Sequence, residues 1–134
     1  MPAAKYDFTI EQGSSFKLSL VYKNNDQSVK DLTGWCVRLI WITDEGITQT
    51  FSSTNLDYSL YKFSVFGPEG KLLLQIPASL TNLFMFEYAK YDLEIESPNE
   101  MYVGGGNEVI RILYGTVKIL QRYSENETLL ECQT

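Results

Sequence analysis

The side chains that could carry out acid–base chemistry are carboxylates, because the chain contains no histidine. Without histidine, a Ser-His-Asp or Cys-His nucleophile is impossible. Paired carboxylates hydrolyse glycosides, and two groups are candidates: Asp44-Glu45, and the alternating Asp92, Glu94 and Glu96. The first pair lies in an expected turn. Alternation places the second group on one face of a strand, which is typical of a solvated sheet surface. The carboxylates therefore predict no catalytic site.

Phosphate and metal chemistry are also not predicted. Residues 67–71 contain two glycines and a lysine, but they lack the spacing and the Ser or Thr of a phosphate-binding loop. The glycines at 104–106 precede an expected strand, whereas phosphate loops lead into a helix. Two cysteines without histidine are too few for a metal site. We expect Cys36 to be a small core residue and Cys132 to be a free thiol. The sequence predicts a non-enzymatic protein with no cofactor and no metal.

Composition narrows the class of protein further. A chain of 134 residues with 44% hydrophobic and 13% aromatic residues is typical of one globular domain. A net charge of −6 and eleven scattered basic residues argue against nucleic-acid binding. No apolar run approaches the roughly 18 residues of a membrane span, and the first residues lack the apolar region of a signal peptide. We expect synthesis in a reducing cytoplasm, one domain over residues 1–120, and a polar C-terminal tail over residues 121–134.

The element around which the others are expected to pack is a strand over residues 35–43. It follows residues 29–34, whose Asp, Thr and Gly favour a tight turn, and it is rich in β-branched and aromatic residues. Both of its faces are apolar except at Arg38, which predicts a central strand covered on both sides. Trp35 and Trp41 are its predicted core anchors.

Alternating or β-rich runs between turn residues predict the other strands. They span residues 6–10, 16–22, 47–51, 62–66, 72–76, 88–97 and 108–120. Residues 44–46 predict a hairpin turn, and residues 98–100 predict a second turn. Gly115 predicts a bulge or bend that exchanges the inward and outward faces of the last strand.

One short helical segment interrupts these strands. Pro77 suits the start of a helix, and one or two turns are predicted to follow it. Leu80, Leu83 and Phe84 have the three-four spacing of a helix face that packs on a core. Seven or eight short antiparallel strands with one helical turn predict an all-β, immunoglobulin-like β-sandwich, with a small barrel as the alternative.

Aromatic residues are unusually numerous, with nine tyrosines and seven phenylalanines. These rings either cap the ends of the core or dock on neighbouring subunits, since tyrosine is favoured at protein interfaces. The residues that we predict to dock lie in the segment 52–67, in the glycine-rich hairpin and in the tail. They are Tyr58, Tyr61, Phe63, Phe66, Tyr102, Leu129 and Leu130.

Several short motifs occur in a recognisable order. They are residues 8–16 (FTIEQGSSF), 31–35 (DLTGW), 76–78 (IPA), 91–95 (YDLEI) and 115–117 (GTV). In this order the chain resembles the small β-sandwich structural proteins of tailed bacteriophages. It is similar to the N-terminal module of baseplate upper proteins and to short tail and neck proteins. The resemblance covers residues 6–120, although the segment 52–67 is longer than usual and the tail extends past the usual end.

The resemblance implies a non-enzymatic virion component that is made in the cytoplasm of the bacterial host. Such a protein acts as an adaptor in the tail, baseplate or neck, in several copies, with other virion proteins as partners. Two alternatives remain open from the residues. Exposed aromatic side chains near carboxylates also suit a carbohydrate- or receptor-binding sandwich module, and a capsid decoration protein has a similar composition.

Overall fold

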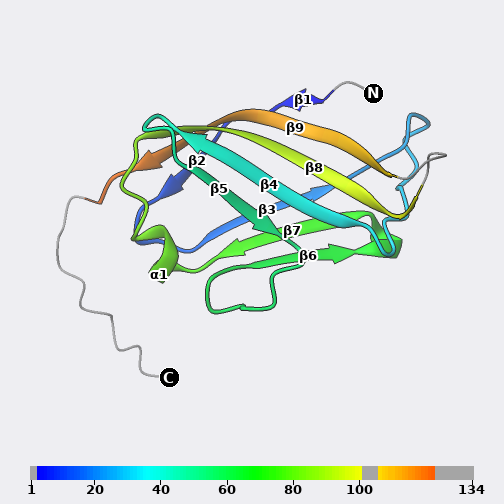
Figure 1. Cartoon of the computed structure of the whole chain (residues 1–134), viewed down its shortest axis with the longest axis horizontal. Coiled ribbons are helices and arrows are strands. Elements are labelled where there is room, and N and C mark those ends of the chain that lie inside the picture. Colours follow the sequence, from blue (N-terminus) through cyan, green and yellow to red (C-terminus); the bar gives the residue numbers. More distant parts are fainter. Residues whose placement is uncertain (1–2, 101–105, 123–134) are drawn as a thin grey trace.

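Two β-sheets pack face to face, and their inner side chains form the core (Figure 1). The computed structural model describes residues 3–100 and 106–122, with only the backbone at residues 99 and 100. Sheet A has the strand order β1 (Ala4–Lys5), β9 (Asn107–Leu120), β8 (Tyr88–Glu100), β4 (Cys36–Thr43) and β5 (Thr48–Ser52), and β2 (Phe8–Glu11) also pairs with β9. Sheet B has the order β3 (Phe16–Val21), β7 (Lys71–Ile76) and β6 (Lys62–Phe66). The all-β prediction is confirmed.

Sheet A is mixed, so the prediction of purely antiparallel strands is wrong. β1 and β2 both run parallel to β9, with Ala4 opposite Leu113 and Phe8 opposite Val117. Between the two short strands, the amide of Thr116 donates a hydrogen bond to the carboxylate of Asp7 (2.8 Å). This hydrogen bond bridges the gap between β1 and β2, where the backbone pairing with β9 is interrupted. It therefore helps to hold both strands against β9.

β4 is an interior strand, but β8 occupies the middle of sheet A. The prediction that β4 is covered on both faces is also wrong. Its inward residues are fully buried, whereas Ile42 on the outer face is 54% exposed. Cys36 lies half-buried on that outer face, and not in the core. Trp35 precedes the strand and packs half-buried at the edge of the core.

Trp41 is the centre of an aromatic cluster between the sheets. Its ring is fully buried and meets Phe51, Phe84 and Phe86 edge-on, with centroid distances of 4.8, 5.3 and 5.4 Å. Edge-to-face contacts of this kind add to the free energy of burial. The prediction that Trp41 anchors the core is confirmed.

β8 and β9 differ from expectation at two points. The predicted turn at residues 98–100 is absent, because β8 continues to Glu100, which pairs with Asn107. The predicted bulge lies at Ile112, and not at Gly115. Leu93 pairs with Leu113 and Glu94 pairs with Arg111, so Ile112 is the extra residue. The face exchange that the sequence predicted therefore occurs three residues earlier.

The helix α1 is a single turn, Ala78–Thr81, that follows Pro77. A turn at residues 82–83 follows, in which the amides of Leu83 and Phe84 donate hydrogen bonds to the carbonyls of Leu80 (3.0 Å) and Thr81 (3.1 Å). The side-chain amide of Gln12 also donates to the carbonyls of Asn82 (3.3 Å) and Phe84 (3.1 Å). Phe84 is consequently buried, but Leu83 points outward. The prediction that Leu83 packs on the core is wrong, because the helix ends at Thr81 and the side chains of residues 83–86 then alternate between exposed and buried.

Candidate protein-docking surfaces

The predicted docking residues do not form one surface. Tyr58 is 57% exposed, and Phe66 is also exposed, but Phe63 is only 5% exposed and belongs to the core. Tyr61 is half-buried: its hydroxyl accepts a hydrogen bond from the amide of Ser52 (3.0 Å), and its ring packs on Phe51. Tyr102, Leu129 and Leu130 lie outside the described residues. Tyr58 and Phe66 are therefore the two described members that offer a large surface to a partner.

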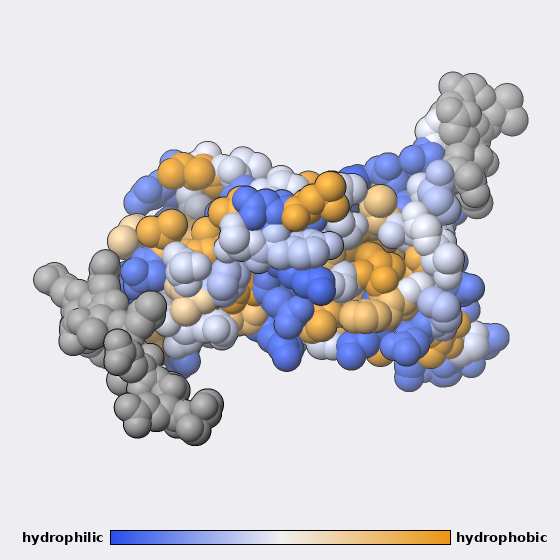
Figure 2. Space-filling model, turned by 90° about the horizontal axis from the view of Figure 1, so that it is seen from below, coloured by the Kyte–Doolittle hydropathy of each residue, from blue (hydrophilic) through white to orange (hydrophobic). Residues whose placement is uncertain are grey.

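Tyr58 belongs to an exposed apolar loop, residues 53–61, between β5 and β6. Leu56 and Leu60 are exposed beside it. The side-chain amide of Asn55 donates to the carbonyls of Asp57 and Tyr61, both at 2.9 Å, so polar contacts inside the loop fix its path. Figure 2, which views the molecule from the side of sheet B, shows apolar side chains between hydrophilic ones on this side. The loop therefore presents Leu56, Tyr58 and Leu60 outward while Tyr61 attaches it to the core.

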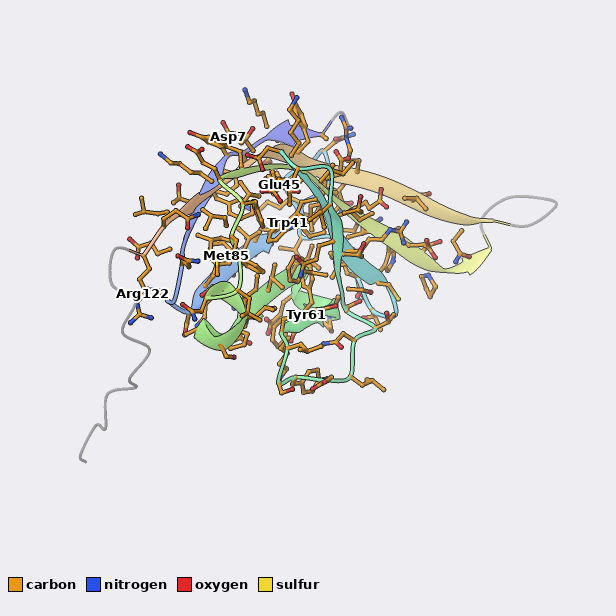
Figure 3. The ribbon with its side chains drawn as sticks, turned by 60° about the vertical axis from the view of Figure 1, so that its left-hand side comes forward. Asp7, Trp41, Glu45, Tyr61, Met85 and Arg122 are labelled. Carbon is orange, nitrogen blue, oxygen red and sulfur yellow. The ribbon has the colours of Figure 1, made fainter. Side chains whose placement is uncertain are left out.

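A second apolar surface was not predicted from the sequence. We call Ile47, Leu83 and Met85 the end patch; they are 60%, 65% and 72% exposed. The β4–β5 hairpin and the segment before β8 bring them together around a shallow hollow of about 210 Å³, which Phe84 and Phe86 also line. Figure 3 shows Met85 at the end of the molecule near α1, with Trp41 between the sheets. The alternation of residues 83–86 was the signal that could have revealed it.

In the part of the chain that the structure describes, four aromatic rings carry a cation over one face. Lys62 lies over Tyr58, Lys71 over Phe66, Lys30 over Trp35 and Arg111 over Tyr114, at 5.1, 5.5, 5.1 and 5.0 Å from the ring centroids. Each pair places a positive charge next to the apolar surface of an aromatic ring. They suit a partner that offers carboxylates next to apolar side chains.

The alternating carboxylates lie on the outer face of sheet A, where cations neutralise them. Arg38 forms ion pairs with Glu94 and Glu96, the second at 3.0 Å, and Arg111 pairs with Asp92 at 3.2 Å. A hydrogen bond from the Asn107 amide, followed in size by the one from Arg38, lowers the pKa of Glu96. Carboxylates with lowered pKa values are poor general acids.

The pKa of Glu96 has a consequence for stability at low pH. Because its folded-state pKa is depressed, its contribution is present above the unfolded-state pKa and is lost as the pH falls through the folded-state value. Asn107→Ala should therefore lose less stability than the wild type between about pH 6 and about pH 3. Urea denaturation at several pH values measures this. Thr50→Ala, on the same outer face, is the control, and equal pH slopes for Asn107→Ala and the wild type would contradict the assignment.

Within the described residues, no group of three His, Cys, Asp or Glu side chains is placed to bind a metal ion. No helix in the same part of the chain has the length and apolar character to cross a membrane. Comparison with family models and with curated proteins yields no match for this chain.

Proposed function

We propose that this protein is a non-enzymatic structural protein of a tailed-bacteriophage virion. It acts as an adaptor in the tail, baseplate or neck, in several copies and in contact with other virion proteins. Its sandwich is of the immunoglobulin-like kind. Two kinds of observation support the proposal: the ordered motifs of residues 8–117, and the apolar surfaces on a two-sheet β fold.

The end patch is the observation that carries the docking role. Three large apolar side chains are each more than half exposed, and they surround one hollow. Their segments are fixed from beneath by Phe84 and Phe86, which pack against Trp41. A rigid apolar patch loses little conformational entropy when a partner binds, so it favours stable assembly.

Protein docking is better supported than carbohydrate binding. Sugars stack on the faces of aromatic rings, but a lysine or arginine lies over one face of each of four surface rings. We therefore expect no reproducible binding of the purified protein on a glycan array. Specific binding to one class of glycan would favour a carbohydrate-binding module instead.

Immunogold electron microscopy of particles purified from the source culture tests the virion assignment. Antibodies against the purified protein should label the tail, baseplate or neck. Label over the capsid would make the protein a decoration protein. No label, together with no peptide from the protein in mass spectra of the particles, would overturn the assignment.

The end patch can be tested by substitution in the same particles. Leu83→Ser combined with Met85→Ser should reduce incorporation about tenfold, since exposed apolar side chains at an interface each contribute roughly 1 kcal/mol or more. Quantitative mass spectrometry of purified particles measures incorporation. Val109→Ser is the control, because it removes an exposed apolar side chain from β9, outside the end patch. Incorporation of the double variant at the control level would exclude the end patch as a docking surface.

A further inference from the structure

The outer face of sheet B is basic, although the chain as a whole is acidic. We call its nine outward residues the basic face. They are Lys17, Ser19, Val21, Lys62, Ser64, Phe66, Lys71, Leu73 and Gln75. Three of the nine are lysines and none is acidic, whereas the net charge of the chain is −6. The positive charge on this face is therefore local.

These lysines have no ion-pair partner within the described residues. Lys62 and Lys71 lie over Tyr58 and Phe66, which leaves their charge uncompensated. The nearest carboxylates along the chain are Glu11, Asp57 in the apolar loop and Glu69 in the 3-10 turn η1 (Gly67–Glu69), and none of them pairs with a lysine of this face. On the outer face of sheet A, by contrast, arginines pair with the acids.

The composition of residues 123–134 complements this face. The segment contains Glu125, Glu127 and Glu131, no lysine or arginine, and the pair Leu129-Leu130. Opposite charges and matching apolar groups are the properties that select one surface over another. The segment thus offers acids to match the lysines, and leucines to match the apolar Val21, Phe66 and Leu73.

The described chain ends close to the basic face. The amide of Arg122 donates to the side-chain carbonyl of Gln12 (2.9 Å), and the side chain of Arg122 lies against Gly13. Gly13 is four residues before Lys17 of β3. Twelve extended residues span up to about 40 Å, and a six-residue strand is about 20 Å long. The segment is long enough to cover all three strands.

The end patch is a poorer site for this segment. Glu45 lines its hollow, and Asp44 and Glu87 flank its residues in the chain, so an acidic segment would be repelled there. Both the end patch and the basic face offer apolar side chains to this segment, but only the basic face also has the opposite charge.

We propose that residues 123–134 dock on the basic face of the same chain. The carboxylates of Glu125, Glu127 and Glu131 pair with the lysines, and Leu129 and Leu130 pack on the apolar residues between them. Because the segment is tethered, its local concentration at the face is high. The inference does not depend on a virion role.

Zero-length carbodiimide cross-linking of the full chain tests the contact directly, since it joins carboxylates to amines that touch. Cross-links from the three glutamates to Lys17, Lys62 and Lys71 should exceed those to Lys5, Lys90 and Lys118 of sheet A about fivefold. An equal mixture of unlabelled and ¹⁵N-labelled chains identifies the copy involved. Cross-linked pairs of one isotope only support the proposal. Mixed pairs at the statistical frequency would assign the contact to a second copy, and even cross-linking of all lysines would also overturn it.

Cleavage by trypsin after Arg122 gives a second readout. The triple variant Lys17→Gln, Lys62→Gln, Lys71→Gln should be cut about fivefold faster than the wild type, because docking restrains the cleaved bond. The matched control is Lys5→Gln, Lys90→Gln, Lys118→Gln, which makes the same change in net charge on sheet A. Circular dichroism verifies that both variants fold. Equal cleavage rates for the two triple variants would overturn the proposal.

Discussion

Trp41→Ala is expected to lower the free energy of unfolding by about 3–5 kcal/mol, the largest effect of any single substitution considered. The side chain is fully buried, and three aromatic rings contact it edge-on. Alanine leaves a cavity that Phe51, Phe84 and Phe86 cannot fill, because each is held by its own strand or segment. Urea denaturation followed by far-ultraviolet circular dichroism measures the loss.

Phenylalanine at the same position separates packing from hydrogen bonding. The indole N–H of Trp41 is buried and finds no acceptor among the described residues, so Trp41→Phe removes an unsatisfied donor while it keeps most of the ring. We expect a loss of about 1–2 kcal/mol. Trp35→Ala is the comparison at a half-buried tryptophan, and it should also cost much less than Trp41→Ala. An equal cost for Trp41→Phe and Trp41→Ala would contradict the expectation that a smaller ring keeps most of the packing.

Gly115→Ala is expected to cost about 3 kcal/mol, because the added methyl group has no room. A Cβ there would lie 2.3 Å from the carbonyl oxygen of Tyr6 and 2.8 Å from its carbonyl carbon. Backbone atoms cannot move aside as a flexible side chain can, so β1 and β2 would have to separate from β9. Hydrogen exchange of residues 4–11 should accelerate together with the fall in the urea midpoint.

The control for this substitution is a glycine with space around it. Gly46 in the β4–β5 turn has a φ of +84°, and a Cβ there would meet nothing within 4 Å. Gly46→Asn should change stability by less than about 1 kcal/mol, since asparagine tolerates this conformation. Protected amides in β1 and β2 of Gly115→Ala would contradict the expected separation of strands.

Local patterns in the sequence predicted the local elements well. The strand Lys62–Phe66 has the predicted boundaries, and Lys71–Ile76 and the turn at residues 44–46 are close to expectation. Their alternation and turn residues act over a few positions. The parallel pairing of β1 and β2 with β9 was missed because it joins residues about one hundred positions apart. No short-range pattern specifies such a partner.

The candidate docking surfaces likewise depend on local patterns, which the sequence shows, and on long-range contacts, which it does not. Phe63 was predicted to dock because aromatic residues cluster around it, but strand alternation places it inside. The end patch was missed because Pro77 favoured reading residues 80–84 as a helix. The helix instead ends at Thr81 and a turn at residues 82–83 follows, held by contacts with Gln12, some seventy residues away. The sequence could predict that large apolar groups are in excess, but not where they gather.

The attachment of the first strands to the last one sets a condition on the order of folding. Asp7 and Thr116, which hydrogen-bond to each other, are 109 residues apart, and among the described strands of sheet A β2 pairs with β9 alone. Pairings of such high contact order form late, after most of the chain has been synthesised. During synthesis, Phe8 and Ile10 cannot take their native places in sheet A until β9 has emerged from the ribosome. Native structure in sheet A is therefore completed only once β9 is available, and until then the nascent chain is exposed to aggregation and to chaperones.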